Sequence, residues 1–131
     1  PVRSLSMAIR RAGIDIREIG YVNAHATSTK AGDANEAKAI HNIFGEKTVE
    51  VTSTKSQTGH EMWMAGASEV IYSMIMMKNG FIAGNINFEN PDEDSRHLLI
   101  PSKTVDKSFG TFLSNSFGFG GTNSTLVIRN M

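Results

Sequence analysis

Short apolar runs alternate with segments of helical periodicity along most of the sequence, and this alternation constrains the fold most. Runs rich in β-branched and aromatic residues predict strands; they cover residues 19–24, 49–54, 111–116 and 124–129, with a further short strand within 81–88. Apolar residues three and four apart predict helices over residues 3–12, 33–44 and 61–78. We therefore expect an α/β protein with a mixed β-sheet and packed helices.

The ends of the predicted helices carry recognisable signals. Gly13 and Gly45 follow the first two helices as C-terminal caps. Asp33 and Glu36 have the spacing of a capping box at the start of the second helix. The third helix is apolar on most sides, which predicts burial all round, with its methionines as core filler.

Composition excludes several classes of protein. Thirteen basic residues balance thirteen acidic ones, so a nucleic-acid binder or a membrane-surface protein that works through bulk positive charge is not expected. The sequence has no cysteine, which excludes a disulfide, a thiolate zinc site or a cysteine nucleophile within these residues. The most apolar stretch, 62–77, contains Glu69 and is too short to span a bilayer.

The N-terminus lacks the apolar segment of a signal peptide, so we expect a cytoplasmic protein. The sequence begins at Pro1 rather than at a methionine and runs straight into a helical pattern. We therefore expect it to be a piece of a longer protein.

Three polar clusters follow predicted strands, where ligands bind in open α/β sheets. They are His25 with Thr27 and Thr29, then Lys55 with His60, and finally the glycine-rich turn 117–123. Thr27 and Thr29 alternate, so their hydroxyls are expected on one side, where they can bind a polar ligand chain.

The histidines favour proton or hydrogen-bond chemistry over metal binding. Their positions, 25, 41, 60 and 97, lack the spacing of a metal site, so no metal is expected. A single histidine is more often structural than catalytic, and His41 and His97 are interpreted in that way. His25 and His60 differ because each follows a strand among small hydroxyl residues, and two neutral imidazoles can donate hydrogen bonds to a developing oxyanion.

Lys55 has two interpretations. It is either a solvated surface charge or a cation that keeps the His60 imidazole neutral. Glu69 lies inside the apolar helix, where a buried carboxylate needs a partner, and Lys55 is the simplest candidate.

The glycine turn also has two interpretations. Its glycines either supply the positive φ of a simple hairpin, or they leave a backbone N–H free to act as an oxyanion donor. The strand–turn–strand order and the absence of a GK[ST] sequence exclude a nucleotide-binding loop.

Three stretches together resemble a known family. They are Asn23–Asp33 (NAHATSTKAGD), Thr54–His60 (TKSQTGH) and Asn115–Asn123 (NSFGFGGTN). In this order and spacing they resemble the C-terminal half of a β-ketoacyl-acyl-carrier-protein synthase of the I/II elongation branch, and the resemblance covers nearly all of residues 1–131. It implies one half of a thiolase-like fold, with the cysteine nucleophile in an N-terminal half that has no match here.

The resemblance also implies roles for individual residues. The family's active site is a Cys–His–His set with a nearby lysine and acidic residue, to which four positions correspond: His25, His60, Lys55 and Glu69. Thr27 and Thr29 match the threonines that bind the phosphopantetheine arm. Phe119 matches the residue whose N–H completes the oxyanion hole and whose ring gates the acyl pocket.

Three departures from the family pattern stand out. Ala26 replaces a glycine, Lys30 replaces a frequent proline, and Glu61–Met64 (EMWM) replaces a run of small residues after the second histidine. The last change puts in doubt the packing at the start of the third helix, but not the assignment of His60.

The implied activity is the decarboxylative Claisen condensation of malonyl-acyl-carrier protein in fatty acid biosynthesis. No cofactor is expected, because phosphopantetheine arrives on the carrier protein. The expected partners are acyl carrier protein, the N-terminal half and a second copy in a homodimer. The chain alone is expected to be inactive.

Three alternatives remain open: a polyketide ketosynthase, a non-catalytic partner module that resembles a chain-length factor, and an unrelated binding domain. His25, Lys55 and His60 argue against the partner module. The ordered recurrence of three motifs argues against an unrelated domain.

Overall fold

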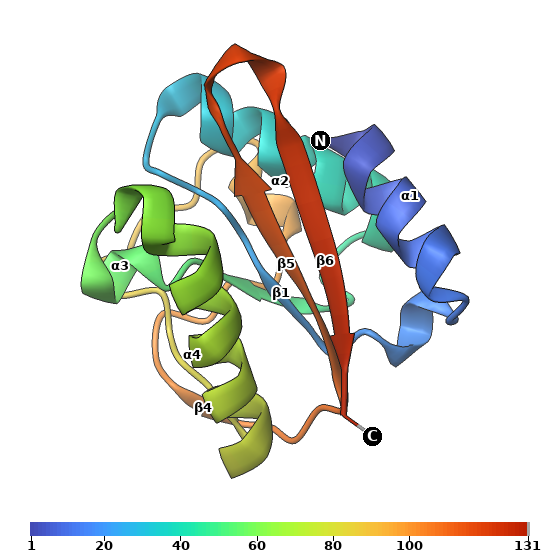
Figure 1. The fold of residues 1–131 in the computed structure, drawn as a ribbon. Helices are drawn as coiled ribbons and strands as arrows, with labels where there is room; N and C mark the ends of the chain where they lie inside the picture. Colours follow the sequence, from blue (N-terminus) through green and yellow to red (C-terminus); the bar gives the residue numbers. More distant parts are fainter. Residues whose placement is uncertain (131) are drawn as a thin grey trace.

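The computed structural model describes residues 1–130, which form a four-stranded mixed sheet with helices on both faces (Figure 1). The strand order is β2-β1-β5-β6. The central strand β1 (Tyr21–Asn23) pairs in parallel with β2 (Glu50–Thr52) and with β5 (Thr111–Phe117). β6 (Asn123–Arg129) pairs antiparallel with β5. The predicted α/β class with a mixed sheet is confirmed.

Two helices cover one face of the sheet and one covers the other (Figure 1). α1 (Val2–Ala12) and α2 (Lys30–Phe44) pack on the first face. α4 (Ala65–Asn79) packs on the second face. The predicted cap at Gly13 is confirmed: it has φ 64°, a left-handed conformation that favours glycine.

The period of two along the strands divides the core into two clusters. Val22 and Leu113 point toward α1 and α2, where they pack with Leu5 and Ile40. Side chains of the opposite parity point toward α4 and pack into the second cluster, which comprises Tyr21, Phe112, Met76, Ile82 and Phe109.

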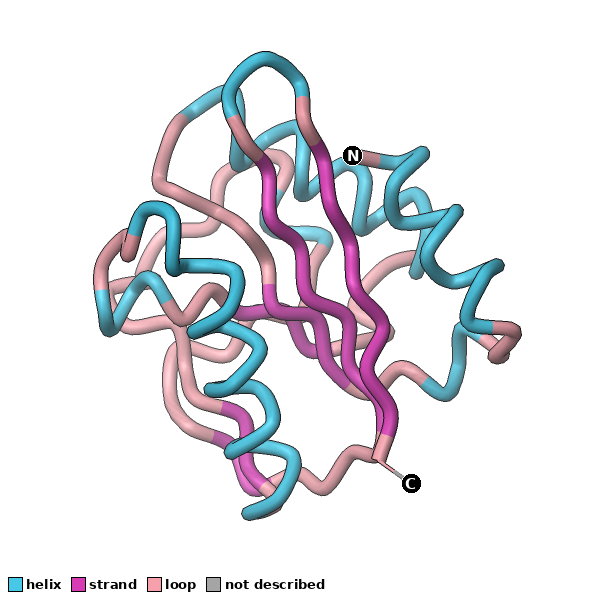
Figure 2. The backbone as a smooth tube through the Cα atoms, viewed as in Figure 1, coloured by secondary structure: helices cyan, strands magenta, loops and turns pink. Residues whose placement is uncertain are grey.

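Short elements complete the chain. The single-turn helix α3 spans Lys55–Thr58, and 3-10 turns span Ile16–Glu18 (η1), Met62–Met64 (η2), Ser95–His97 (η3) and Phe119–Gly121 (η4). The predicted strand within 81–88 is only β3 (Phe81–Ile82), which pairs antiparallel with β4 (Val105–Asp106). Figure 2 shows this pair apart from the main sheet.

The predicted capping box was wrong. α2 begins at Lys30, so Asp33 lies inside the helix, where its N–H donates to the Thr29 carbonyl at 2.9 Å. Glu36 lies deeper still and is buried. The cause is that the helix starts one turn earlier than its apolar pattern indicated.

The prediction of burial all round for 61–78 was also wrong. The segment divides into η2 and α4, and only one side of α4 packs against the sheet. Met62, Met64 and Met74 are exposed, whereas Met76 is buried in the core. Gly66 allows the start of α4 to approach β5, because a Cβ there would lie 2.8 Å from Ser116 Oγ.

Candidate active site

His25 lies just after β1, in a connection held by a buried carboxylate from α2. The backbone N–H groups of His25 and Ala26 donate to the two oxygens of Glu36 at 2.9 and 2.8 Å. Asn115 Nδ2 on β5 donates to Glu36 Oε1 at 2.9 Å. One carboxylate thus joins the His25 connection, α2 and β5.

Glu36 and Asn115 are site residues that the sequence analysis missed as such. Burial raises the pKa of Glu36, while hydrogen bonds from Ala26, Asn115 and His25 oppose that rise. The available signal was the position of Glu36 beside Ala37 and Ile40 on the apolar side of the helix. A carboxylate there needs hydrogen-bond donors from elsewhere in the fold.

His60 reaches His25 from the segment that follows β2, the strand paired with β1. β2 leads through α3 to Gly59, whose φ of 77° turns the chain immediately before His60. The His25 and His60 ring centroids are 5.6 Å apart and the rings are nearly perpendicular, at 86°. The two predicted histidines therefore lie together, although 35 positions separate them in the sequence.

The orientation of the His60 ring follows from a local hydrogen bond. The Met62 backbone N–H donates to His60 Nδ1 at 3.0 Å. Because Nδ1 accepts, the proton of the neutral ring is on Nε2. His60 Nε2–H is then the available donor.

Lys55 and Glu69 form the predicted ion pair. Lys55 Nζ donates to Glu69 Oε1, and the two side chains are only 6% and 3% exposed. Burial raises the pKa of Glu69, and the Lys55 ammonium opposes that rise. The surface-charge interpretation of Lys55 is therefore wrong.

His25 is held in its neutral form. Burial, together with the Lys55 cation and His60, lowers the pKa of His25 from 6.5 to about 4. The predicted effect of Lys55 on an imidazole is thus found at His25, while its effect on His60 stays a prediction.

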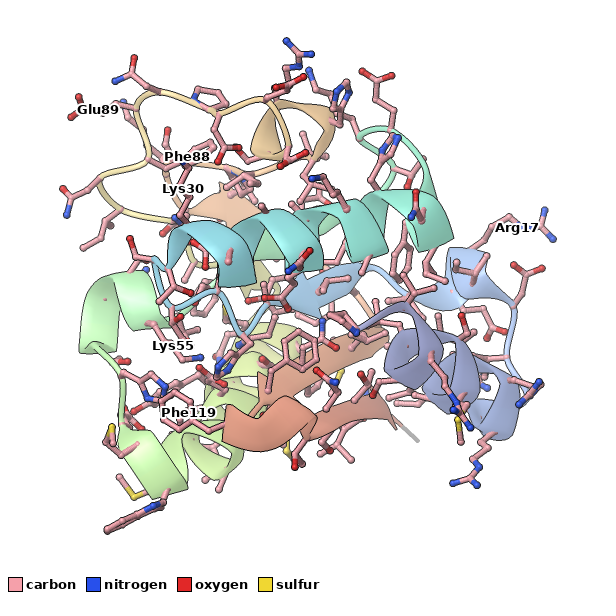
Figure 3. The ribbon with its side chains drawn as sticks, turned by 90° about the horizontal axis from the view of Figure 1, so that it is seen from above. Arg17, Lys30, Lys55, Phe88, Glu89 and Phe119 are labelled. Atoms are coloured by element: carbon pink, nitrogen blue, oxygen red, sulfur yellow. The ribbon has the colours of Figure 1, made fainter. Side chains whose placement is uncertain are left out.

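The remaining predicted residues lie outside the strands and α-helices. Thr27 Oγ1 and Thr29 Oγ1 are 3.1 Å apart, so the two hydroxyls do share one side. Phe119 begins the turn between β5 and β6, and Figure 3 shows it toward the same side of the molecule as Lys55. Its ring is fully exposed and does not pack on either histidine; Phe117 does, 5.6 Å from the His25 ring.

The turn itself requires glycine. Gly120 and Gly121 have φ of 78° and 84°, a region that other residues rarely adopt. The prediction of an antiparallel pair joined by this turn is confirmed.

The structure describes a second histidine pair, which the sequence analysis did not foresee. The rings of His41 and His97 are 5.2 Å apart, and His97 Nδ1 lies 3.8 Å from a Glu46 carboxylate oxygen.

Within residues 1–130, no group of three or more His, Asp or Glu side chains is arranged to hold a metal ion. No helix in this same range has the length and apolar character needed to cross a membrane.

A pair of imidazoles beside a buried lysine has a definite chemical capacity. Two N–H donors can stabilise one oxygen atom as it becomes negative, which is the requirement of an enolate-forming step. His25 does not have to lose a proton first, because its ring is neutral near pH 7.

Comparison with known sequences gives a consistent result. Residues 2–89 match the family described as "Beta-ketoacyl synthase, C-terminal domain". The chain is 47% identical over 130 residues to 3-oxoacyl-[acyl-carrier-protein] synthase 1 of Escherichia coli (strain K12), covering 99% of this chain and 31% of that protein. It is 42% identical over 129 residues to 3-oxoacyl-[acyl-carrier-protein] synthase 2 of Staphylococcus aureus, covering 97% and 32%. The chain thus spans about a third of these relatives.

Solved structures give the same family. A β-ketoacyl synthase from Burkholderia phymatum STM815 superposes with a TM-score of 0.93 at 34% identity, over 99% of this chain and 32% of that one. The ishigamide ketosynthase/chain length factor superposes with a TM-score of 0.93 at 31% identity, over the same shares. The thiolase-like fold predicted from the resemblance is confirmed. From its motifs, its fold and the match over residues 2–89, the chain belongs to the β-ketoacyl synthase C-terminal domain family.

Proposed function

We propose that this chain supplies the C-terminal part of a 3-oxoacyl-acyl-carrier-protein synthase, an acyltransferase of fatty acid biosynthesis. The observation that carries the proposal is the convergence of His25 and His60, whose ring centroids are 5.6 Å apart. The 47% identity to a 3-oxoacyl-[acyl-carrier-protein] synthase supports the substrate class.

The proposed reaction has two half-reactions. First, a cysteine thiolate of the rest of the enzyme attacks an acyl thioester, the bond from the acyl carbon to the carrier sulfur breaks, and the carrier thiolate leaves. Second, the bond between the malonyl α-carbon and its carboxylate breaks, CO₂ leaves, and the electron pair moves into an enolate. The enolate carbon then attacks the acyl-cysteine carbonyl, and the cysteine thiolate leaves as the new carbon–carbon bond forms.

His25 and His60 act in the second half-reaction. Their N–H groups donate to the malonyl thioester oxygen, which gains negative charge as CO₂ leaves. These hydrogen bonds are stronger in the transition state than in the ground state, so they lower the barrier. The depressed pKa of His25 supports this role, because a neutral ring serves as a donor without taking part in proton exchange.

The other predicted residues assist one or the other half-reaction. Lys55, paired with Glu69, places a fixed positive charge near the imidazoles. Thr27 and Thr29 hydrogen-bond the phosphopantetheine arm. The Phe119 N–H completes the oxyanion hole of the first half-reaction, and its ring gates the acyl pocket.

The same proposal covers cofactor and partners. The enzyme needs no cofactor of its own, since phosphopantetheine arrives on acyl carrier protein, and it works as a cytoplasmic homodimer, as the family resemblance implies. One solved neighbour is a type II polyketide synthase acyl-carrier protein in complex with its ketosynthase, which supports a carrier protein as partner.

A polyketide ketosynthase is the second candidate. It is favoured by solved neighbours that include ketosynthases with chain length factors, at 31% and 33% identity. The higher identity to fatty acid synthases argues for the first candidate.

The test is the substitution His60→Ala in the complete enzyme. Loss of one such donor is expected to reduce malonyl-thioester decarboxylation by on the order of a hundredfold. Asn79→Ala, on the far end of α4, is the control. Near-normal CO₂ release by His60→Ala would remove His60 from the mechanism.

A further inference from the structure

Glu61 follows His60 directly and replaces one of the small residues of the family pattern. Its carboxylate oxygen Oε1 accepts a hydrogen bond from the Tyr72 hydroxyl on α4 at 2.7 Å. Hydrogen bonding by Ser68 and Tyr72 lowers the pKa of Glu61, so its side chain is a carboxylate near pH 7. Ser68 and Tyr72 are four residues apart, on one face of α4.

The peptide unit between Glu61 and Met62 is hydrogen-bonded at both ends. Its carbonyl accepts from the Met64 N–H at 3.1 Å, and its N–H donates to His60 Nδ1 at 3.0 Å. Met62 has φ 53°, a left-handed conformation that is costly for a residue other than glycine. Surrounding contacts must therefore hold this peptide in place.

We infer that Glu61 is a positioning residue for His60: its bond to Tyr72 ties the His60–Met62 segment to α4 and keeps the Met62 N–H on His60 Nδ1. With Nδ1 occupied, the proton of the neutral ring stays on Nε2, the nitrogen left to donate to substrate. Without the bond between Glu61 and Tyr72, the His60–Met62 segment can relax from its strained conformation, and the His60 ring loses its fixed tautomer. This inference rests on the proposed role of His60 in decarboxylation.

The experiment compares the two half-reactions in the complete enzyme. The variants are Tyr72→Phe, Glu61→Ala and Glu61→Gln, with Asn79→Ala as the matched control. Asn79 also lies on α4 and donates to the Ile75 carbonyl at 2.8 Å, so its loss removes a hydrogen bond of the same helix that does not involve Glu61. Thermal unfolding of each variant checks that it is folded.

Tyr72→Phe and Glu61→Ala should each lower kcat for malonyl-thioester decarboxylation by about tenfold, as expected for loss of one hydrogen bond to a charged group. Self-acylation of the cysteine from an acyl thioester should stay within about twofold of the parent, because that step does not use His60. Glu61→Gln keeps an acceptor for the Tyr72 hydroxyl and should recover most of the decarboxylation rate. The double variant Glu61→Ala/Tyr72→Phe should be no slower than Glu61→Ala alone.

Two results would overturn the inference. One is unchanged decarboxylation in Glu61→Ala and Tyr72→Phe, and the other is an equal fall in both half-reactions, which indicates only a general loss of structure. A parent enzyme that is acylated but releases no CO₂ from malonyl thioester would instead overturn the proposed function, and this inference with it.

Discussion

Lys55 and Glu69 form an ion pair in which both side chains are almost completely buried, at 6% and 3% exposure. Lys55 lies in α3 on one side of His60 in sequence, and Glu69 lies in α4 on the other. The pair therefore joins the two segments that flank His60, and it places a cation near His25.

Removing one partner of this pair should be costly. In the Glu69→Gln variant of the complete protein, the Lys55 ammonium stays buried without a counter-charge, which should lower the free energy of unfolding by about 3 kcal/mol. The double substitution Lys55→Met/Glu69→Gln removes the uncompensated charge and should recover part of the loss. Urea unfolding followed by circular dichroism measures both, and equal stability of Glu69→Gln and parent would contradict the prediction.

The depressed pKa of His25 predicts a pH dependence of stability. The unfolded chain takes up a proton near pH 6.5, whereas the folded chain does so only near pH 4. The contribution of His25 to the free energy of unfolding is therefore fully present above about pH 6.5 and is lost as the pH falls toward 4. His25→Gln should show a smaller fall in urea midpoint between pH 7 and pH 5 than the parent.

His97→Gln, in η3, is the control for this pH prediction. Its substitution leaves His25 in place, so it should retain the part of the pH dependence that belongs to His25. An identical fall in midpoint for the parent and for His25→Gln would refute the assignment of this titration to His25.

The buried Glu36 carboxylate should tolerate little change. Glu36→Gln replaces one acceptor oxygen with an NH₂ group, which would face a donor at His25, Ala26 or Asn115. An unsatisfied buried donor costs about 1–3 kcal/mol, and the His25 connection should shift with it. Unfolding free energy and decarboxylation rate should both fall, whereas Glu93→Gln, at an exposed position, should change neither.

Much of this architecture was predictable because its signals are local. β-branched runs indicated β1, β2, β5 and β6, and the need of Glu69 for a partner indicated Lys55. β3 was predicted only as part of a longer range, 81–88, and β4 was missed, because two-residue strands carry almost no periodicity.

The role of Glu36 was not predictable from local pattern either. Its partners lie 10, 11 and 79 positions away, and only the fold brings them together. The family resemblance implied that His25 and His60 lie close together. The spacing of the two residues along the sequence does not by itself predict the 5.6 Å between their ring centroids.

The isolated 131-residue chain should not catalyse condensation. It contains no cysteine, so it has no thiol to carry the acyl group, although His25 and His60 are both present. Incubation with acyl- and malonyl-carrier protein should yield no β-ketoacyl product by mass spectrometry. Steady product formation with no added protein would show that another nucleophile replaces the thiol.

The same isolated chain should self-associate through α4. Ile71, Met74 and Ile75 recur at helical spacing and are 55%, 48% and 48% exposed, so they form an apolar strip on the side of the helix away from the sheet. Sedimentation velocity should detect association that rises with concentration, and Ile71→Lys/Ile75→Lys should reduce it. Asn35→Lys/Asn42→Lys adds the same two charges on exposed positions of α2 and serves as the control. If the control variant also shows reduced association, net charge rather than the apolar strip governs association.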